Sequence, residues 1–106
     1  MADTDLPFEV RTPLGFSVRV TKARWELITT IKHPVMNGRE AIVKLALASP
    51  DEVRQSRSEA TVFLFYTADG TRRWVCAVAK HAGDHAFLVT AYPTDAIKEG
   101  TRVWPK

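Results

Sequence analysis

Hydrophobic and polar residues alternate in two short segments near the N-terminus. The segments are residues 8–11 and 16–20, and a Pro-Leu-Gly sequence between them is typical of a turn. Alternation with a period of two places one set of side chains on each face of a strand. The pattern therefore predicts a hairpin or two short edge strands.

The period lengthens after residue 20. Apolar residues recur every third position over residues 22–32, which predicts a helix with one face in the core, and Thr21 can cap its first turn. Pro34 disfavours helical backbone at His33, so we expect this helix to end just before the histidine. Asn37, with a glutamate three residues later, can begin a second helix. His33 is thus expected at a junction between two helices.

A third, shorter helix is expected over residues 50–55. Ser49 is a suitable cap, a proline follows at the first helical position, and two acidic residues lie in the first turn. The first half of the chain is therefore predicted to be mainly helical beyond its hairpin.

The second half has the composition of a β-sheet. Apolar and aromatic residues fill residues 60–66, 73–80 and 86–92, and an Ala-Asp-Gly turn joins the first two of these segments. A short last strand or ordered tail follows at residues 101–104. Helices followed by strands predict an α+β fold, in which N-terminal helices pack on a C-terminal antiparallel sheet of three to four strands.

The third of these strands ends in a row of hydroxyl groups. Thr90, Tyr92 and Thr94 are at alternate positions, so they share one face until Pro93 interrupts the regular pairing. A polar row on one face of a sheet is a place where chemistry can occur. The alternative is that these residues are good strand formers whose hydroxyls face water.

Composition limits the class of protein. The chain has 106 residues, of which 45% are hydrophobic and 25% are charged, as is typical of one soluble domain. We expect that domain to span residues 1–106, with residues 1–7 loosely held. No apolar run approaches the ~20 residues of a membrane span, the N-terminus is acidic and polar, and the single cysteine has no internal partner. A cytoplasmic protein without membrane contact is predicted.

No metal or other cofactor is expected. Cys76 lies in an apolar strand, where a small core residue is a simpler interpretation than a nucleophile. His81 and His85 flank a loop, and with Cys76 they lack a plausible zinc spacing.

Charge is unevenly distributed along the chain. The net charge is +3, whereas residues 10–48 alone carry seven Lys or Arg and two Glu, a balance of +5. A basic N-terminal half suggests an anionic partner, and RNA is the obvious candidate. The alternative is that these basic side chains are simply solvated.

Metal-independent cleavage of RNA is the chemistry suggested by these segments. It uses the 2′-hydroxyl of the RNA as nucleophile, and it needs proton transfer and cations around the phosphate. Histidine titrates near neutral pH, so His33 suits a proton-transfer role. Arg54 and Lys80 can hold the phosphate, while Thr90 and Tyr92 can donate hydrogen bonds to its non-bridging oxygens.

Four further residues are expected to contact RNA: Lys32, Arg39, Arg57 and Thr94. Arg57 could also replace Arg54 as the phosphate ligand. Each site residue has a simpler alternative, because the junction histidine could cap helix carbonyls and the basic residues could be solvated.

Six segments together resemble a small bacterial and phage-associated family of nucleases. They are His33-Pro34, Ser49-Pro50-Asp51-Glu52-Val53-Arg54-Gln55-Ser56, Leu64-Phe65-Tyr66, Val78-Ala79-Lys80, Val89-Thr90-Ala91-Tyr92 and Ile97-Lys98-Glu99-Gly100. The family belongs to the superfamily of barnase, EndoU, colicin and RelE-like nucleases, and the resemblance covers about residues 22–104. It implies a helical part on a four-stranded antiparallel sheet, with metal-independent RNA cleavage on the open face. It also implies a toxin or effector role, with a cognate inhibitor or antitoxin as a candidate partner.

The chain departs from barnase-like enzymes in one respect. Those enzymes use a carboxylate as general base. Glu26 and Glu59 are candidates here, and neither matches an established motif. The second proton-transfer role stays open.

Three functions compete. A toxin-like ribonuclease needs His33, Arg54, Lys80 and Thr90 to converge in one cleft. A non-catalytic RNA-binding or regulatory module on the same scaffold needs only a continuous basic face. A protein-interaction domain would use apolar surface around the tryptophans at positions 74 and 104.

Overall fold

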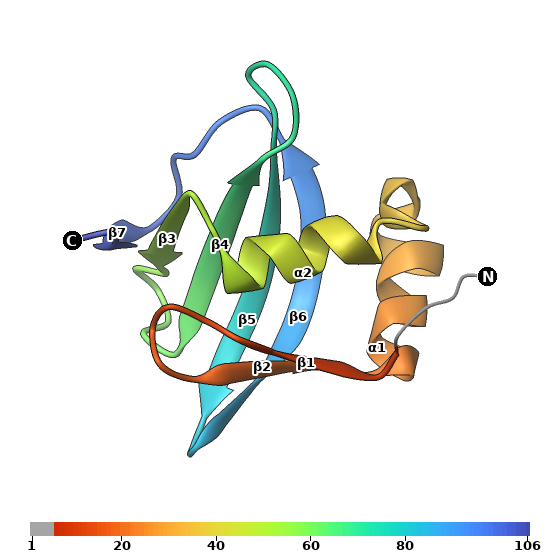
Figure 1. Cartoon of the computed structure of the whole chain (residues 1–106), viewed down its shortest axis with the longest axis horizontal. Coiled ribbons are helices and arrows are strands. Elements are labelled where there is room, and N and C mark those ends of the chain that lie inside the picture. Colours follow the sequence, from red (N-terminus) through yellow and green to blue (C-terminus); the bar gives the residue numbers. More distant parts are fainter. Residues whose placement is uncertain (1–5) are drawn as a thin grey trace.

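One mixed β-sheet runs through the computed structural model, which describes residues 6–106. Its strands are β1 (Phe8–Arg11), β2 (Ser17–Val20), β3 (Glu52–Gln55), β4 (Val62–Ala68), β5 (Trp74–Ala82), β6 (His85–Thr94) and β7 (Thr101–Trp104). Their order across the sheet is β1-β2-β6-β5-β4-β3-β7 (Figure 1). Neighbouring strands are antiparallel, except that β2 and β6 are parallel.

This sheet corrects the expected fold class. We predicted N-terminal helices on an antiparallel sheet of three to four strands, and that prediction is wrong: the sheet has seven strands and is mixed. The N-terminal hairpin is confirmed, but it extends the sheet because Val18 pairs with Ala86 and Arg19 pairs with Phe87. Residues 1–5 of the segment expected to be loosely held lie outside the described residues, and Leu6 packs against the core.

The helical segments connect β2 to β3. They are α1 (Lys22–Leu27), the π-helix η1 (Ile28–Lys32), the 3₁₀-helix η2 (Pro34–Met36) and α2 (Glu40–Ala48). Thr21 caps α1 as predicted, because its Oγ1 accepts a hydrogen bond from the N–H of Arg24 at 3.1 Å. The predicted end of the first helical segment before His33 is also confirmed. The N–H of His33 donates to the carbonyl of Ile28 at 2.6 Å and closes the π-helical turn.

The third predicted helix is wrong, because its residues form β3. Asp51 does not lie in a first helical turn: its N–H donates to the carbonyl of Tyr66 at 2.7 Å, and its Oδ2 accepts from the N–H of Ala68 at 2.6 Å. Both bonds tie the chain to β4. β3 then pairs with β4 on one side and with β7 on the other, so long-range pairing overrides the local helix signals.

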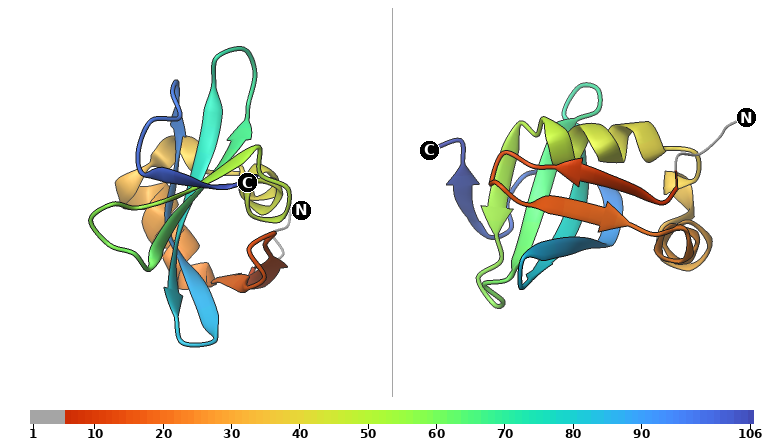
Figure 2. Two further views of the ribbon diagram at one scale, coloured as in Figure 1. Left: turned by 90° about the vertical axis from the view of Figure 1, so that its left-hand side faces the viewer. Right: turned by 60° about the horizontal axis from the view of Figure 1, so that its bottom comes forward.

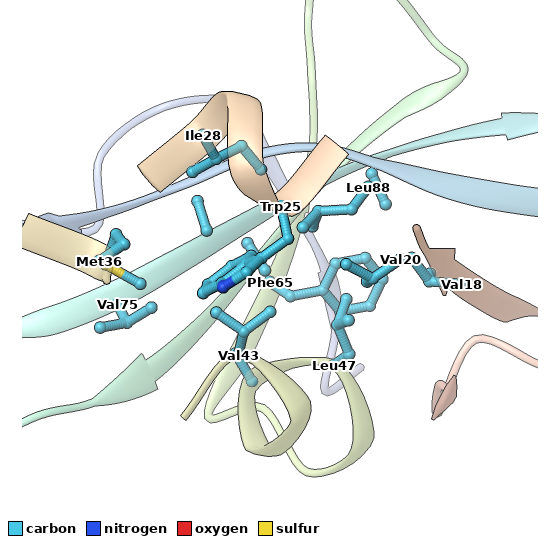
Figure 3. Close-up of a cluster of buried hydrophobic side chains, with 14 of the residues drawn as sticks. Val18, Val20, Trp25, Ile28, Met36, Val43, Leu47, Phe65, Val75 and Leu88 are labelled. Carbon is cyan, nitrogen blue, oxygen red and sulfur yellow. The ribbon is translucent and has the colours of Figure 1, made fainter. Parts of the chain in front are cut away.

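The first face of the sheet carries the main hydrophobic core. α2 crosses this face, and the β1–β2 hairpin lies on the same side (Figure 2). Trp25 of α1 and Phe65 of β4 are among the largest buried side chains, and they lie between α2 and the strands (Figure 3). The helical segment that carries His33 is thus anchored to the same core as the strands.

A bulge in β6 determines what faces the second side of the sheet. Val78 pairs with Thr90, but the next residue, Ala79, pairs with Leu88, so Val89 is an extra residue. Leu88 points into the first-face core. The extra residue reverses the alternation, and the hydroxyl residues beyond it point toward the second face.

Candidate functional site

Three side chains form a continuous row across the second face. Tyr66 of β4 is directly opposite Cys76 of β5, which is directly opposite Tyr92 of β6. Each tyrosine is close enough to the thiol for the two groups to influence one another's pKa. Tyr66 and Cys76 are buried and Tyr92 is partly buried, in a small cluster separate from the main core. We call these three residues the central row.

The central row keeps its protons at neutral pH. Burial raises the pKa of the Cys76 thiol to about 12, although the neighbouring hydroxyls of Tyr92 and Tyr66 oppose the rise. Burial is also the main cause that raises the pKa of each tyrosine, and the neighbouring Cys76 adds to it. The tyrosines can therefore donate hydrogen bonds, whereas the buried thiol is not a nucleophile.

Because the pKa of the Cys76 thiol is raised in the folded state, we expect the protein to lose stability at alkaline pH. In the unfolded chain the thiol has its ordinary pKa of 9.0, whereas the folded pKa is about 12. Between these values the folded state binds more protons than the unfolded state, so the free energy of unfolding falls as pH rises. The slope for this one group is at most about 1.4 kcal/mol per pH unit, measurable by urea unfolding over an alkaline pH series.

Cys76→Ala is the control for that measurement. It removes the thiol and should flatten the alkaline slope, while the contribution of the two tyrosines remains. Identical slopes for wild type and Cys76→Ala would contradict the assignment of a buried, protonated thiol.

His33 lies beside one end of the central row. Its ring centroid is 5.5 Å from that of Tyr92, and the two rings are inclined at 43°. The imidazole is partly buried. The helical segments α1 and η1 run beside β6 (Figure 1), and the π-helical turn ends in the histidine. The junction histidine and the hydroxyl row of β6 therefore lie on the same side of the sheet, as the proposed site requires.

The two threonine hydroxyls of β6 differ in their surroundings. Thr90 Oγ1 is buried and has no hydrogen-bond partner within the described chain. Thr94 Oγ1 donates to the carbonyl of Ala96 at 3.2 Å and accepts from its N–H at 3.4 Å, which closes the turn after β6. A buried hydroxyl without a partner costs about 1–3 kcal/mol. Thr90 is therefore the hydroxyl that would gain most from a ligand, provided that the ligand can reach it.

The two cations predicted to hold a phosphate already have partners. Arg54 donates from Nε to Glu52 Oε2 at 2.7 Å and from Nη1 to the carbonyl of Gly100 at 3.1 Å. Lys80 Nζ lies 2.8 Å from Glu59 Oε2, and these two side chains are 42% and 52% exposed. Water screens an exposed ion pair, so it adds little to stability. Lys80 can therefore exchange its partner for an anion more easily than Arg54 can.

The residues predicted to bind RNA lie in separate parts of the molecule. Lys32 is exposed at the end of η1, next to His33. Arg39 Nη2 pairs with Asp69 Oδ1 at 2.8 Å and joins the start of α2 to the β4–β5 turn. Arg57, between β3 and β4, donates from Nε to Thr101 Oγ1 at 3.4 Å.

A carboxylate that the sequence did not single out lies near the central row. Ile97, in the connection from β6 to β7, packs against the second-face cluster. Gly100 has a φ of +80°, and a Cβ there would lie 2.6 Å from the carbonyl oxygen of Gln55, so this connection is pressed against β3. Glu99 lies between these two anchors, and its charge contributes to the raised pKa of all three central-row residues.

The two carboxylates considered from sequence are placed differently. Glu59 pairs with Lys80, which lowers the pKa of Glu59. The exposed Glu26 lies in α1, and its carbonyl accepts a hydrogen bond from Thr30 Oγ1 at 2.5 Å. Glu99 follows no helical or strand periodicity. Its only signal in the sequence is its place in the last of the six segments that carry the nuclease resemblance.

Within residues 6–106, no group of three or more His, Cys, Asp or Glu residues could hold a metal ion. None of the helices in the same part of the chain is long and apolar enough to cross a bilayer. No protein-family model, curated protein or solved structure matches the chain. The resemblance to nucleases therefore stays a prediction that depends on the six segments alone.

Proposed function

We propose that this protein cleaves RNA on the second face of its sheet, without a metal ion. The observation that carries the proposal is the position of His33, whose ring lies 5.5 Å from that of Tyr92 on the face that also carries Thr90. Residues separated by more than fifty positions in sequence thus supply an imidazole, which can accept or donate a proton, and adjacent hydrogen-bond donors. We place this activity in the cytoplasm, where RNA is available.

The proposed reaction is attack of the 2′-oxygen on the adjacent phosphorus. The 2′-hydroxyl gives its proton to a base, a P–O bond forms, and the bond to the 5′-oxygen breaks as an acid protonates that oxygen. His33 takes part in one of these proton transfers. The protonated hydroxyl of Tyr92 can stabilise charge on the non-bridging oxygens, and Thr90 can join it once a rearrangement of this face exposes its buried hydroxyl.

We assign the second proton transfer to Glu99 in place of the two carboxylates considered first. Glu99 is exposed, and its charge contributes to the raised pKa of Tyr92, whose ring lies beside that of His33. Lys80 points to this face as well, and its exposed pairing with Glu59 leaves it able to move to a phosphate. Arg54 holds the Gly100 carbonyl and thereby supports the segment that carries Glu99.

A non-catalytic RNA-binding module is the second candidate. One observation favours it: Arg54 and Lys80 both have partners and Thr90 Oγ1 is buried, so a phosphate would have to rearrange this face before cleavage. Binding at the surface requires no such rearrangement.

Incubation of the purified protein with a broad RNA panel separates these candidates. The proposed reaction yields 2′,3′-cyclic phosphate and 5′-hydroxyl ends, and EDTA leaves the rate unchanged because no step uses a metal. His33→Ala protein purified in parallel controls for contaminating ribonuclease. Binding without cleavage across the panel would favour the non-catalytic module.

The pH–rate profile tests the role of Glu99. If Glu99 accepts the proton, the rate should fall at acidic pH as the carboxylate is protonated, and Glu99→Gln should remove this acidic limb. Glu9, on β1, is an exposed glutamate for the control Glu9→Gln, which should leave the profile unchanged. An acidic limb that persists in Glu99→Gln would assign the second proton transfer elsewhere.

A further inference from the structure

The turn between β4 and β5 carries two arginines that nothing described so far uses. Arg72 and Arg73 are both exposed, and their side chains have no ion pair or hydrogen bond within the described chain. Arg72 has a φ of +56°, in the left-handed region that residues other than glycine seldom occupy. Two adjacent unpaired cations therefore project from a constrained turn.

The same turn leads directly into an aromatic side chain on the second face. Trp74 is the first residue of β5, is partly buried, and packs against the cluster that contains Tyr66 and Cys76. It pairs with Thr94 of β6, which is two residues beyond Tyr92. The indole therefore continues the aromatic surface of the candidate site toward the two arginines.

The position of the turn is fixed by one contact to another part of the molecule and by one hydrogen bond within the turn. Arg39 Nη2 lies 2.8 Å from Asp69 Oδ1, which ties the turn to the start of α2. The N–H of Asp69 donates to the carbonyl of Arg73 at 2.8 Å, which closes the turn itself. The Arg39 pair also neutralises the acidic residue of the turn, so the two free arginines determine its charge.

We propose that Arg72, Arg73 and Trp74 form a binding arm for single-stranded RNA next to the candidate site. The arginines neutralise phosphates of the strand, and the indole stacks on one unpaired base. Paired bases in an A-form duplex are stacked on one another and hide their faces from a side chain. The arm therefore selects single strands. This inference rests on the proposed function in taking RNA as the ligand.

Salt-dependent binding of a fluorescent oligouridylate tests the arm. The measurement uses the His33→Ala protein, so the RNA stays intact whether or not the wild type cleaves it. Replacing both Arg72 and Arg73 with alanine should reduce the slope of log K against log salt by about 1.4, since each phosphate contact to a single strand contributes about 0.7. Trp74→Leu, which keeps an apolar side chain against the cluster, should weaken binding by about 5- to 150-fold at constant salt.

The matched control removes the same number of charges elsewhere. Arg11 and Arg19 are exposed on the β1–β2 hairpin, and their double alanine variant should keep most of the affinity. The duplex of oligouridylate with oligoadenylate should bind more weakly than the single strand. Equal losses of affinity in the two double variants, or equal affinity for duplex and single strand, would contradict the proposed binding arm.

The outcome is distinguishable from failure of the cleavage proposal. If wild type does not cleave RNA but loss of the arm weakens single-strand binding selectively, the arm stands and the catalytic assignment fails. If wild type cleaves RNA but the Arg72 and Arg73 double variant binds and cleaves as before, the arm fails and the catalytic assignment stands.

Discussion

Replacing His33 with alanine is expected to lower the rate of RNA cleavage by about 10²–10⁴-fold, the usual contribution of a general acid–base group. The imidazole lies beside Tyr92, and its two ring nitrogens allow it to accept or donate a proton. Alanine retains the N–H that donates to the carbonyl of Ile28, so the π-helical turn and the fold should persist. Single-turnover cleavage and thermal unfolding, measured on the same protein, check both parts.

His85→Ala is the matched control for this variant. His85 is exposed at the start of β6, and its Nδ1 lies 3.0 Å from Asp84 Oδ1. Its loss should change neither the cleavage rate nor the melting temperature appreciably. Equal rates for His33→Ala and wild type, with the fold intact, would remove the histidine from the mechanism.

Phe65→Ala is expected to destabilise the protein by about 3–5 kcal/mol, the usual cost of removing a fully buried phenylalanine. Phe65 has no exposed surface, and its ring meets that of Phe16 edge to face, with centroids 6.4 Å apart. The substitution leaves a cavity between the central strands and the N-terminal hairpin. Such a loss is a large fraction of the 5–15 kcal/mol typical of a small domain.

The variant Phe87→Ala tests how much of the destabilisation expected for Phe65→Ala is due to burial of the ring. Phe87 is also in a strand of the sheet, but it is 37% exposed. Replacing it with alanine should lower the free energy of unfolding by less than about 1 kcal/mol, because a partly exposed side chain leaves no enclosed cavity. Urea unfolding of both variants gives the two free energies. Similar losses in the free energy of unfolding for the two variants would contradict the placement of Phe65 in the main core.

The strands of the second half were predictable because their apolar and aromatic runs are long enough to distinguish a strand from a helix. The residues of β3 were not: Glu-Val-Arg-Gln after Ser-Pro-Asp satisfies the rules for a helix start as well as those for a strand. Pairing with β4 and β7 decides between them, and those partners are distant in sequence. The parallel pairing of β2 with β6 has no local signal for the same reason.

The candidate site was predictable in part. The period of two correctly places Thr90 and Tyr92 on one face, and the proline correctly places His33 at a junction. Which side of the sheet that face is on depends on the extra residue Val89, and no pattern in the sequence marks it. The position of Glu99 depends on how an irregular connection is anchored, which periodicity does not describe.

The bulge at Val89 makes the site sensitive to chain length as well as to side-chain identity. Deleting one residue between Leu88 and Thr90 would restore plain alternation along β6. Thr90 and Tyr92 would then turn toward α2, and Ala91 would take their place on the opposite face. A homologous chain could keep every hydroxyl of this strand and still have lost the site. When related sequences are aligned, a gap at this position is therefore more informative about inherited activity than a substitution at any one hydroxyl.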